Sequence, residues 1–265
     1  MVVARSMVAL GAEAFDLGEQ QGAGSVLLLH GLTGSPAEMR PIGEALARAG
    51  HRAVCPLLPG HGTTPLELNN VSAVDMRAAA ERALQSLGPG RHAVCGLSMG
   101  ALLALGLAAH HSEIRGIVTM APPFVPAGRT WGFVNVLGRL RIPKRFGLLL
   151  RKGKSVERPG TYLAVPLRWG RELRCLIEQA RIDANRITMP ALVLHGEKDD
   201  AADPRGSRQL MALLPSTTSR LLFFPGAGHV LPLSSEAENV CSEIVRFATE
   251  GFLDSKTPIH PHGSS

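Results

Sequence analysis

One five-residue segment has the spacing of an activated nucleophile. Gly96-Leu97-Ser98-Met99-Gly100 follows a short apolar run and precedes an Ala/Leu-rich stretch of helical character. A Ser on a sharp strand-to-helix turn needs neighbours without a Cβ two residues away on each side, and its hydroxyl then lies beside the positive end of the helix. The alternative is a Gly-rich turn in which Ser98 is an ordinary N-cap. The strand–turn–helix setting favours a nucleophilic Ser98.

A serine hydroxyl needs a general base, which needs an orienting carboxylate. His229 lies in a Gly-rich loop after the last expected strand, at the carboxyl edge where the nucleophile is also expected. His110 and His111 end the helix that begins at Ser98, so they point away from it, and His195 ends a strand, where a core position is the simplest interpretation. His229 is therefore the predicted base, with a plain surface-loop histidine as the alternative.

The acid is expected in the loop after the preceding strand, which offers four carboxylates. Asp199 lies four residues beyond His195, about the length of a tight turn back toward the site. Asp203 stands before Pro204 and has the position of a helix N-cap. Asp199 is the predicted acid and Asp200 its rival. Such an Asp holds the imidazole in one tautomer and stabilises its charged form.

Two backbone N–H groups are expected to stabilise the oxyanion that forms during acyl transfer. One is the amide of Met99, directly after the nucleophile. The other belongs to loop 30–36, whose two glycines let the backbone turn its amides inward, and we assign it to Leu32. The same loop also suits a helix entry with Ser35 as N-cap, and both descriptions can hold. The sequence contains no phosphate-binding G-x-x-x-x-G-K-[ST] segment.

These residues need a scaffold of alternating strands and helices. Short apolar runs predict strands over Ser25–His30, Ala53–Leu58, His92–Gly96, Gly116–Met120, Pro190–His195 and Arg220–Phe224. Apolar residues at helical spacing predict helices over Pro36–Ala49, Val71–Leu87, Met99–His110, Arg205–Leu214 and Ser235–Gly251. This alternation of nearly continuous apolar strands with helices predicts an α/β fold, with a mostly parallel sheet covered by helices on both faces.

Residues 122–188 interrupt the alternation. The segment has no clear strand, and its prolines divide it into short helical pieces. An insertion of this length between sheet strands predicts an inserted helical cap, or lid. The expected division is a core domain of residues 1–121 and 189–254, a cap of residues 122–188 and a flexible, polar C-terminal tail of residues 255–265.

The cap is both apolar and basic. Its aromatic residues could line an acyl pocket, with ordinary packing as the alternative for each; the candidates are Phe124, Trp131, Phe133 and Trp169. It holds 14 Lys and Arg against 4 Asp and Glu, in a chain of net charge +6. A solvated polar face is the plain interpretation of this excess. The alternatives are steering of anionic substrates and transient contact with an anionic lipid interface.

Composition excludes several classes of protein. The chain has 265 residues, 45% hydrophobic and 19% charged, which is typical of a globular protein with a full core and not of a disordered one. Its apolar runs fall far short of the roughly 20 residues of a membrane span, and residues 7–12 are too short for a secretion signal. Four scattered cysteines without a CxxC pair favour reduced thiols in a cytoplasmic protein and no metal site. No nucleic-acid motif occurs, so no nucleic-acid partner is expected.

Several segments together resemble a known superfamily. HGLTGSP, GLSMG and HGEKDD…GAGHV, in that order, are similar to the α/β-hydrolase fold. LLLHGLTGSPAEM, PGHG, GLSMGALLAL, IVTMAPPF and GHV more closely resemble small bacterial carboxylesterases grouped with bacterial monoacylglycerol lipases. The resemblance covers about residues 25–252 and is weakest through the insertion. It implies a serine hydrolase with a small helical cap and no cofactor. It implies that Ser98 is the nucleophile, Asp199 the acid and His229 the base. It also implies that the amides of Leu32 and Met99 form the oxyanion hole.

The expected function is hydrolysis of short- to medium-chain acyl esters through an acyl-enzyme on Ser98, with monoacylglycerols among the candidate substrates. Acyl transfer, thioester hydrolysis and C–C bond hydrolysis are alternatives for the same three residues. A non-catalytic ligand receptor on a hydrolase scaffold is a third interpretation, against which the intact set Ser98, Asp199 and His229 argues. A Ser at the elbow excludes the aspartate chemistry of epoxide hydrolases and dehalogenases.

Overall fold

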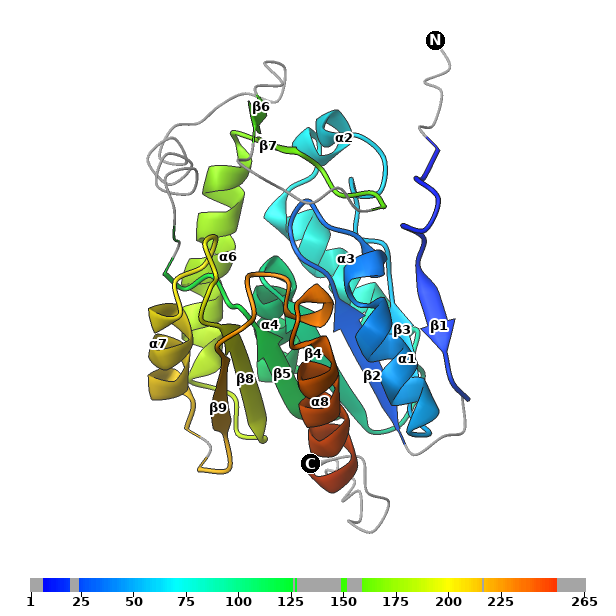
Figure 1. Ribbon diagram of the computed structural model, residues 1–265, viewed down its shortest axis with the longest axis vertical. Helices are drawn as coiled ribbons and strands as arrows, with labels where there is room; N and C mark the ends of the chain where they lie inside the picture. The colour runs from blue at the N-terminus through cyan, green and yellow to red at the C-terminus, as the bar shows by residue number, and fades with distance from the viewer. Residues whose placement is uncertain are drawn as a thin grey trace, which may run out of the picture.

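The computed structural model describes residues 7–19, 24–125, 127, 149–151, 159–215 and 217–251. Its centre is a seven-stranded sheet in the order β1-β3-β2-β4-β5-β8-β9 (Figure 1). The strands are β1 (Phe15–Leu17), β2 (Ser25–Leu29), β3 (Arg52–Cys55), β4 (His92–Leu97), β5 (Ile114–Met120), β8 (Ala191–Gly196) and β9 (Arg220–Phe224). The edge strand β1 runs antiparallel to β3, and the other neighbours pair in parallel. The predicted mostly parallel sheet is confirmed.

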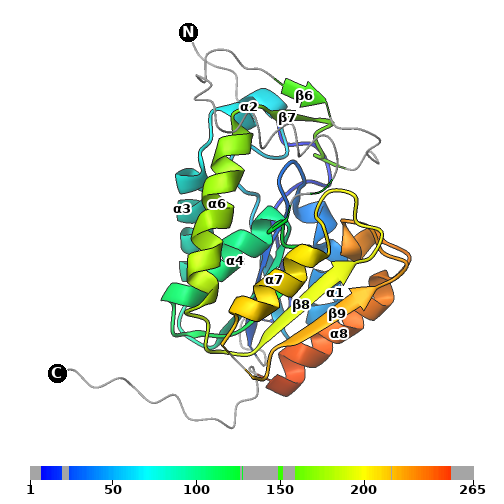
Figure 2. The same cartoon turned by 90° about the vertical axis from the view of Figure 1, so that its left-hand side faces the viewer.

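Helices cover both faces of this sheet, as predicted (Figures 1 and 2). One face carries α1 (Arg40–Arg48) and α8 (Ala237–Gly251), and the other carries α3 (Ala73–Gln85), α4 (Met99–His110), α6 (Trp169–Ala184) and α7 (Arg205–Leu213). Leu27 and Leu29 of β2 point into the core beneath α3 and α4, whereas Val26 and Leu28 point into the core beneath α1 and α8. Because side chains alternate along a strand, a sheet covered on both faces requires continuous apolar strands.

Two local elements differ from the sequence expectation. The short antiparallel strand β1 is not recognisable from its three residues FDL, because its pairing with β3 is a tertiary contact. The chain leaves β3 at Cys55, before the expected end at Leu58, and goes on to the short helix α2 (Pro65–Asn69). Ser72 and Asp75 then form a capping box that starts α3.

The described part of the insertion 122–188 corrects one prediction. A two-stranded antiparallel sheet of β6 (Leu149–Arg151) and β7 (Ala164–Pro166) lies apart from the main sheet, and α6 has 16 residues. The expectation of short helical pieces without a strand is therefore wrong here. After Pro166 the insertion has no further proline, so a helix can run on, with Leu173, Leu176, Ile177 and Ala180 buried on one face.

Candidate active site

Ser98 lies in a strained turn between β4 and α4. Its backbone has φ 55° and ψ −114°, a left-handed conformation that costs free energy for any residue other than glycine. A Cβ at Gly96 would lie 2.2 Å from the carbonyl oxygen of Gly100, and one at Gly100 would lie 2.0 Å from that of Leu29. The amide of Ser98 donates to the Met120 carbonyl at 2.8 Å, which ties the turn to β5. The packing therefore demands both glycines of the motif and holds the Ser98 backbone in its strained form.

Asp199 and His229 are in contact. The Nδ1 of His229 lies 2.8 Å from Oδ2 of Asp199, whose other oxygen accepts the amides of Ala201 at 2.8 Å and Ala202 at 2.9 Å. Asp199 is buried, whereas its rival Asp200 is exposed. A carboxylate facing Nδ1 holds the proton there and leaves Nε2 as the basic nitrogen.

The environment of Asp199 favours its charged form. Burial alone raises the pKa of this carboxyl group, but the charge of His229 and hydrogen bonds from His195, His229 and the Ala202 amide lower it. The net result is a pKa well below the ordinary value of an aspartic acid. Asp199 is therefore ionised throughout the neutral range and can stabilise an imidazolium on His229.

The three candidate residues follow three strands of one parallel sheet. Ser98 comes directly after β4, Asp199 after β8 and His229 after β9, so all three lie at the carboxyl edge. The loops after β8 and β9 are joined by a hydrogen bond of 3.0 Å from the Lys198 amide to the Ala227 carbonyl. The structure thus brings Asp199 and His229 together and places Ser98 at the same edge of the sheet.

The predicted oxyanion loop lies beside Ser98. A Cβ at Gly31 would be 3.5 Å from that of Ser98, so the loop passes close to the nucleophile. Its turn is closed by a bond of 3.2 Å from the Gly34 amide to the Gly31 carbonyl. Among the described residues, neither the Leu32 nor the Met99 amide donates to a protein acceptor. Both remain available to a developing negative charge.

Two histidines that the sequence analysis did not single out support this loop. His30 is fully buried; its Nε2 accepts the amide of Leu58 at 3.1 Å, and its Nδ1 donates to the carbonyl of Gly31 at 3.0 Å. Burial and the nearby His61 lower the pKa of His30 well below its usual value, so the ring is neutral.

His61 holds the same loop from the other side. Its Nε2 accepts the amide of Thr33, a residue with φ of 66°, at 3.2 Å. Tyr162 stacks on the His61 ring with centroids 6.1 Å apart, and its own amide donates to the Thr33 carbonyl at 2.8 Å. The sequence signal for this support was the PGHG segment, which contributed only to the family resemblance.

The three histidines that the sequence offered as alternatives to His229 have structural partners. His195 is fully buried, and its Nε2 lies 3.1 Å from Oδ2 of Asp199, a contact the sequence did not reveal. At the far end of α4, His110 pairs with Asp183 at 3.3 Å, and His111 contacts Glu81. These last two therefore lie a helix length away from Ser98.

Two of the four aromatic cap residues are buried. Trp169 is fully inaccessible, and its indole N–H donates to the Leu68 carbonyl at 2.9 Å. Phe124 is 2% exposed and packs in the same apolar core. This placement corresponds to ordinary packing. Trp131 and Phe133 lie outside the described residues, as does the tail 255–265.

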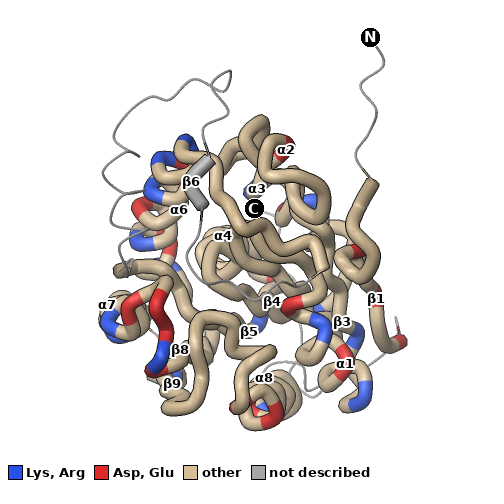
Figure 3. The backbone as a smooth tube through the Cα atoms, turned by 45° about the horizontal axis from the view of Figure 1, so that its top comes forward, with Lys and Arg blue, Asp and Glu red and all other residues tan. Residues whose placement is uncertain are grey.

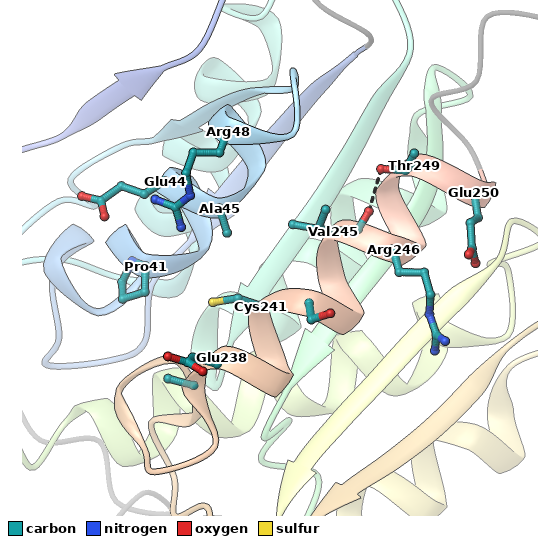
Figure 4. Close-up of a pocket in the computed structure, with 12 residues that line it drawn as sticks. Pro41, Glu44, Ala45, Arg48, Glu238, Cys241, Val245, Arg246, Thr249 and Glu250 are labelled. Carbon is teal, nitrogen blue, oxygen red and sulfur yellow. Dashed lines mark hydrogen bonds between the residues drawn. The ribbon is translucent and has the colours of Figure 1, made fainter.

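A large open groove among the described residues lies elsewhere. It has a volume of about 750 Å³ and runs between α1 and α8, where Pro41, Arg48, Cys241 and Thr249 are among its lining residues (Figure 4). None of the candidate nucleophile, acid, base or oxyanion residues borders it. The described residues contain no cluster of three or more His, Cys, Asp or Glu that could hold a metal ion. No helix in the described ranges is long and apolar enough to cross a membrane.

Comparison with known proteins places this geometry in a family. Residues 20–236 match the Hydrolase_4 family, described as serine aminopeptidase, S33. The thermostable monoacylglycerol lipase of Bacillus sp. (strain H-257) is 30% identical over 89% of this chain and 94% of its own length. The carboxylesterase of Bacillus subtilis (strain 168) is 28% identical over 85% of this chain and 92% of its own length. The solved structure described as LipS and LipT, two metagenome-derived lipolytic enzymes, covers 91% of this chain and 98% of its own, with 27% identity and a TM-score of 0.79. The predicted α/β-hydrolase fold is confirmed.

Proposed function

Since the chain belongs to the Hydrolase_4 family (serine aminopeptidase, S33), we propose that it is a serine hydrolase that cleaves carboxylic esters through an acyl-enzyme on Ser98. The observation that carries this proposal is the contact of 2.8 Å between buried Asp199 and His229, at the sheet edge where Ser98 stands in a strained turn. The names of two relatives, a monoacylglycerol lipase and a carboxylesterase, support ester substrates over the acyltransferase, thioesterase and C–C hydrolase alternatives.

The proposed reaction has two half-reactions. Ser98 Oγ attacks the ester carbonyl and passes its proton to Nε2 of His229, while the amides of Leu32 and Met99 stabilise the oxyanion. Collapse of the intermediate breaks the C–O bond, and His229 returns the proton to the departing alcohol. Water then attacks the acyl-enzyme, again losing a proton to His229, and the carboxylic acid leaves with Ser98 regenerated.

Replacement of Ser98 tests this proposal. Ser98→Ala should lower the turnover of p-nitrophenyl butyrate by at least about 10³-fold and abolish labelling by a fluorophosphonate, because both require the nucleophile. Ser112→Ala, at an exposed serine, is the matched control and should behave like the parent. Turnover of Ser98→Ala at the parental rate refutes the proposal. An amino-acid p-nitroanilide in the same assay distinguishes esterase from aminopeptidase activity.

Short- to medium-chain acyl esters, including monoacylglycerols, are the proposed substrates. The support is the monoacylglycerol lipase among the relatives and an insertion, residues 122–188, that we propose acts as the cap of a core formed by residues 1–121 and 189–254. An apolar lid that excludes water suits a fatty acyl chain. Rates across acyl lengths from about two to sixteen carbons test this, and a flat profile contradicts it.

We also propose that the basic cap makes transient contact with an anionic lipid interface. Arg171, Arg174 and Arg181 of α6 are exposed. Figure 3 shows Lys and Arg positions along this helix, with acidic positions among them. Arg174 is paired with Glu178 at 2.8 Å. The proposal predicts that hydrolysis of a monoacylglycerol in phosphatidylglycerol vesicles falls with added salt, whereas hydrolysis in phosphatidylcholine vesicles does not. Equal salt responses with the two kinds of vesicle would show that these arginines are only solvated and do not contact the lipid surface.

A reducing compartment, the cytoplasm, is the proposed location. Cys55, Cys95, Cys175 and Cys241 are all free thiols. Cys55 and Cys95 are buried, which raises the pKa of both thiols and makes them unreactive. Fractionation of the source cells with an activity assay tests this assignment, and activity confined to the medium would contradict it.

A further inference from the structure

The carboxylate of Asp199 is shared between two histidines. Its Oδ2 lies 2.8 Å from Nδ1 of His229 and 3.1 Å from Nε2 of His195. The side chains of Asp199 and His195 are both fully inaccessible to solvent, so water does not replace the contact between them. With the two amides on Oδ1, the carboxylate has four nitrogen neighbours within 3.1 Å.

The tautomer of His195 follows from its partners. Nε2 also faces the carbonyl oxygen of Ala202 at 3.0 Å, and neither this oxygen nor the Asp199 carboxylate can donate. Nε2 therefore carries the proton. The opposite nitrogen, Nδ1, lies 2.6 Å from Oγ of Ser207, which is fully buried on α7. In the neutral ring the Ser207 hydroxyl donates to Nδ1, which makes the Nε2–H a stronger donor.

The geometry points to His195 as a positioning residue for the proposed hydrolase: with Ser207 behind it, it orients the Asp199 carboxylate and withdraws negative charge from the oxygen that faces His229. This inference rests on the proposed function, because it assigns His195 an effect on the base of that reaction. A buried histidine needs partners for its two ring nitrogens, and the Ser207 hydroxyl and the Ala202 carbonyl supply them, so the contact with the Asp199 carboxylate goes beyond what burial requires.

The expected consequence is a change in the pH at which His229, the proposed base, becomes protonated. A second N–H donor on Oδ2 reduces the charge that stabilises an imidazolium on His229, so His229 stays neutral to lower pH. In the described loop after β8, the neighbouring charged groups are Glu197, Lys198 and Asp200, all exposed, and Asp203, which Arg205 holds at 2.6 Å. Without the His195 donor, the acidic limb of the pH profile of kcat/KM should move to higher pH.

Three variants test the inference. His195→Leu removes the donor and should move the acidic limb upward by about 0.5 to 1 pH unit with p-nitrophenyl butyrate. His195→Gln keeps an N–H near the Nε2 position and should retain the parental limb. Ser207→Ala removes the hydroxyl donor and should move the limb in the same direction as His195→Leu, but less. A lower rate with an unmoved limb in His195→Leu and Ser207→Ala, or equal movement in His195→Gln, would overturn the inference.

Low-field proton NMR gives a readout that does not depend on catalysis. The protected imidazole N–H resonances of the parent should include those of His195 and His229, and Asp199→Asn should shift both because they share one carboxylate. If only one resonance responds, the inference fails even where Ser98→Ala supports the proposed hydrolase. If Ser98→Ala retains turnover, the proposed function fails while the NMR result still decides the shared contact. Ser207→Ala serves both measurements if His195→Leu does not fold.

Discussion

Gly100 packs so closely on Leu29 that an added Cβ would lie 2.0 Å from the Leu29 carbonyl oxygen. This contact joins the first turn of α4 to the end of β2, and it sets the position from which Ser98 enters the site. The glycine is therefore required by packing against a neighbouring strand, in addition to the tightness of its own turn.

Gly100→Ala should destabilise the protein and reduce ester hydrolysis, because either the helix or β2 must shift to remove the clash. We expect a loss of several kcal/mol, on the order of an overpacked core position or more. Gly106→Ala, on the same helix, is the control: its Cβ would meet nothing closer than Asp183 at 3.8 Å, and alanine should stabilise the helix by up to about 1 kcal/mol. Urea unfolding of both variants measures the difference; equal stabilities would contradict the packing argument.

Asp199→Asn should lower kcat by about 10⁴-fold, because an amide neither holds the His229 tautomer nor stabilises its cation. Asp200→Asn should leave kcat within a factor of about two, since the Asp200 side chain is exposed and Asp199 alone contacts His229. Steady-state kinetics on one ester compares the pair. Similar losses in both variants would show that the acid is misassigned.

His30 should make folding stability fall in mild acid. Its pKa in the folded state is lowered, chiefly by burial, so below about pH 6.5 the unfolded chain binds a proton that the folded chain does not. The free energy of unfolding should therefore decrease as the pH falls from about 6.5, by at most about 1.4 kcal/mol per pH unit from this group.

His30→Gln offers an acceptor to the Leu58 amide without the titration, so its stability should depend less on pH between about 5 and 6.5. Some slope will remain, because burial also lowers the pKa of His51. Thermal unfolding across this range provides the measurement. If the variant keeps the full parental dependence of stability on pH, His30 is not the source of that dependence.

His61→Leu should reduce kcat while leaving most of the fold intact. It removes the acceptor of the Thr33 amide at 3.2 Å, and the loop that carries the Leu32 amide then loses one of its fixed points. Because the loss of an oxyanion donor costs about 10²- to 10³-fold, we expect about 10- to 10²-fold for a donor that is merely less well held. His111→Gln, at a histidine on the far end of α4, is the control, and an equal loss there would point to a general effect on stability.

Much of this architecture is encoded locally. The alternation of apolar strands and helices, the elbow around Ser98 and the entry loop with Ser35 and Pro36 depend on residues close together in the chain. Their physical determinants are side-chain periodicity, the freedom of glycine and helix capping, which act within a few residues. For the same reason the order of candidate nucleophile, acid and base could be predicted from the strands they follow.

What the tertiary structure alone decided depends on partners far apart in the sequence. The sequence ranked Asp199 over Asp200, but only burial and the contact with His229 distinguish them physically. The support of the oxyanion loop by His61 joins residues 28 positions apart, and Trp169 reaches its carbonyl partner across 101. Such contacts form because burying a polar group requires a hydrogen-bond partner wherever the fold brings one, and no local pattern records which partner that is.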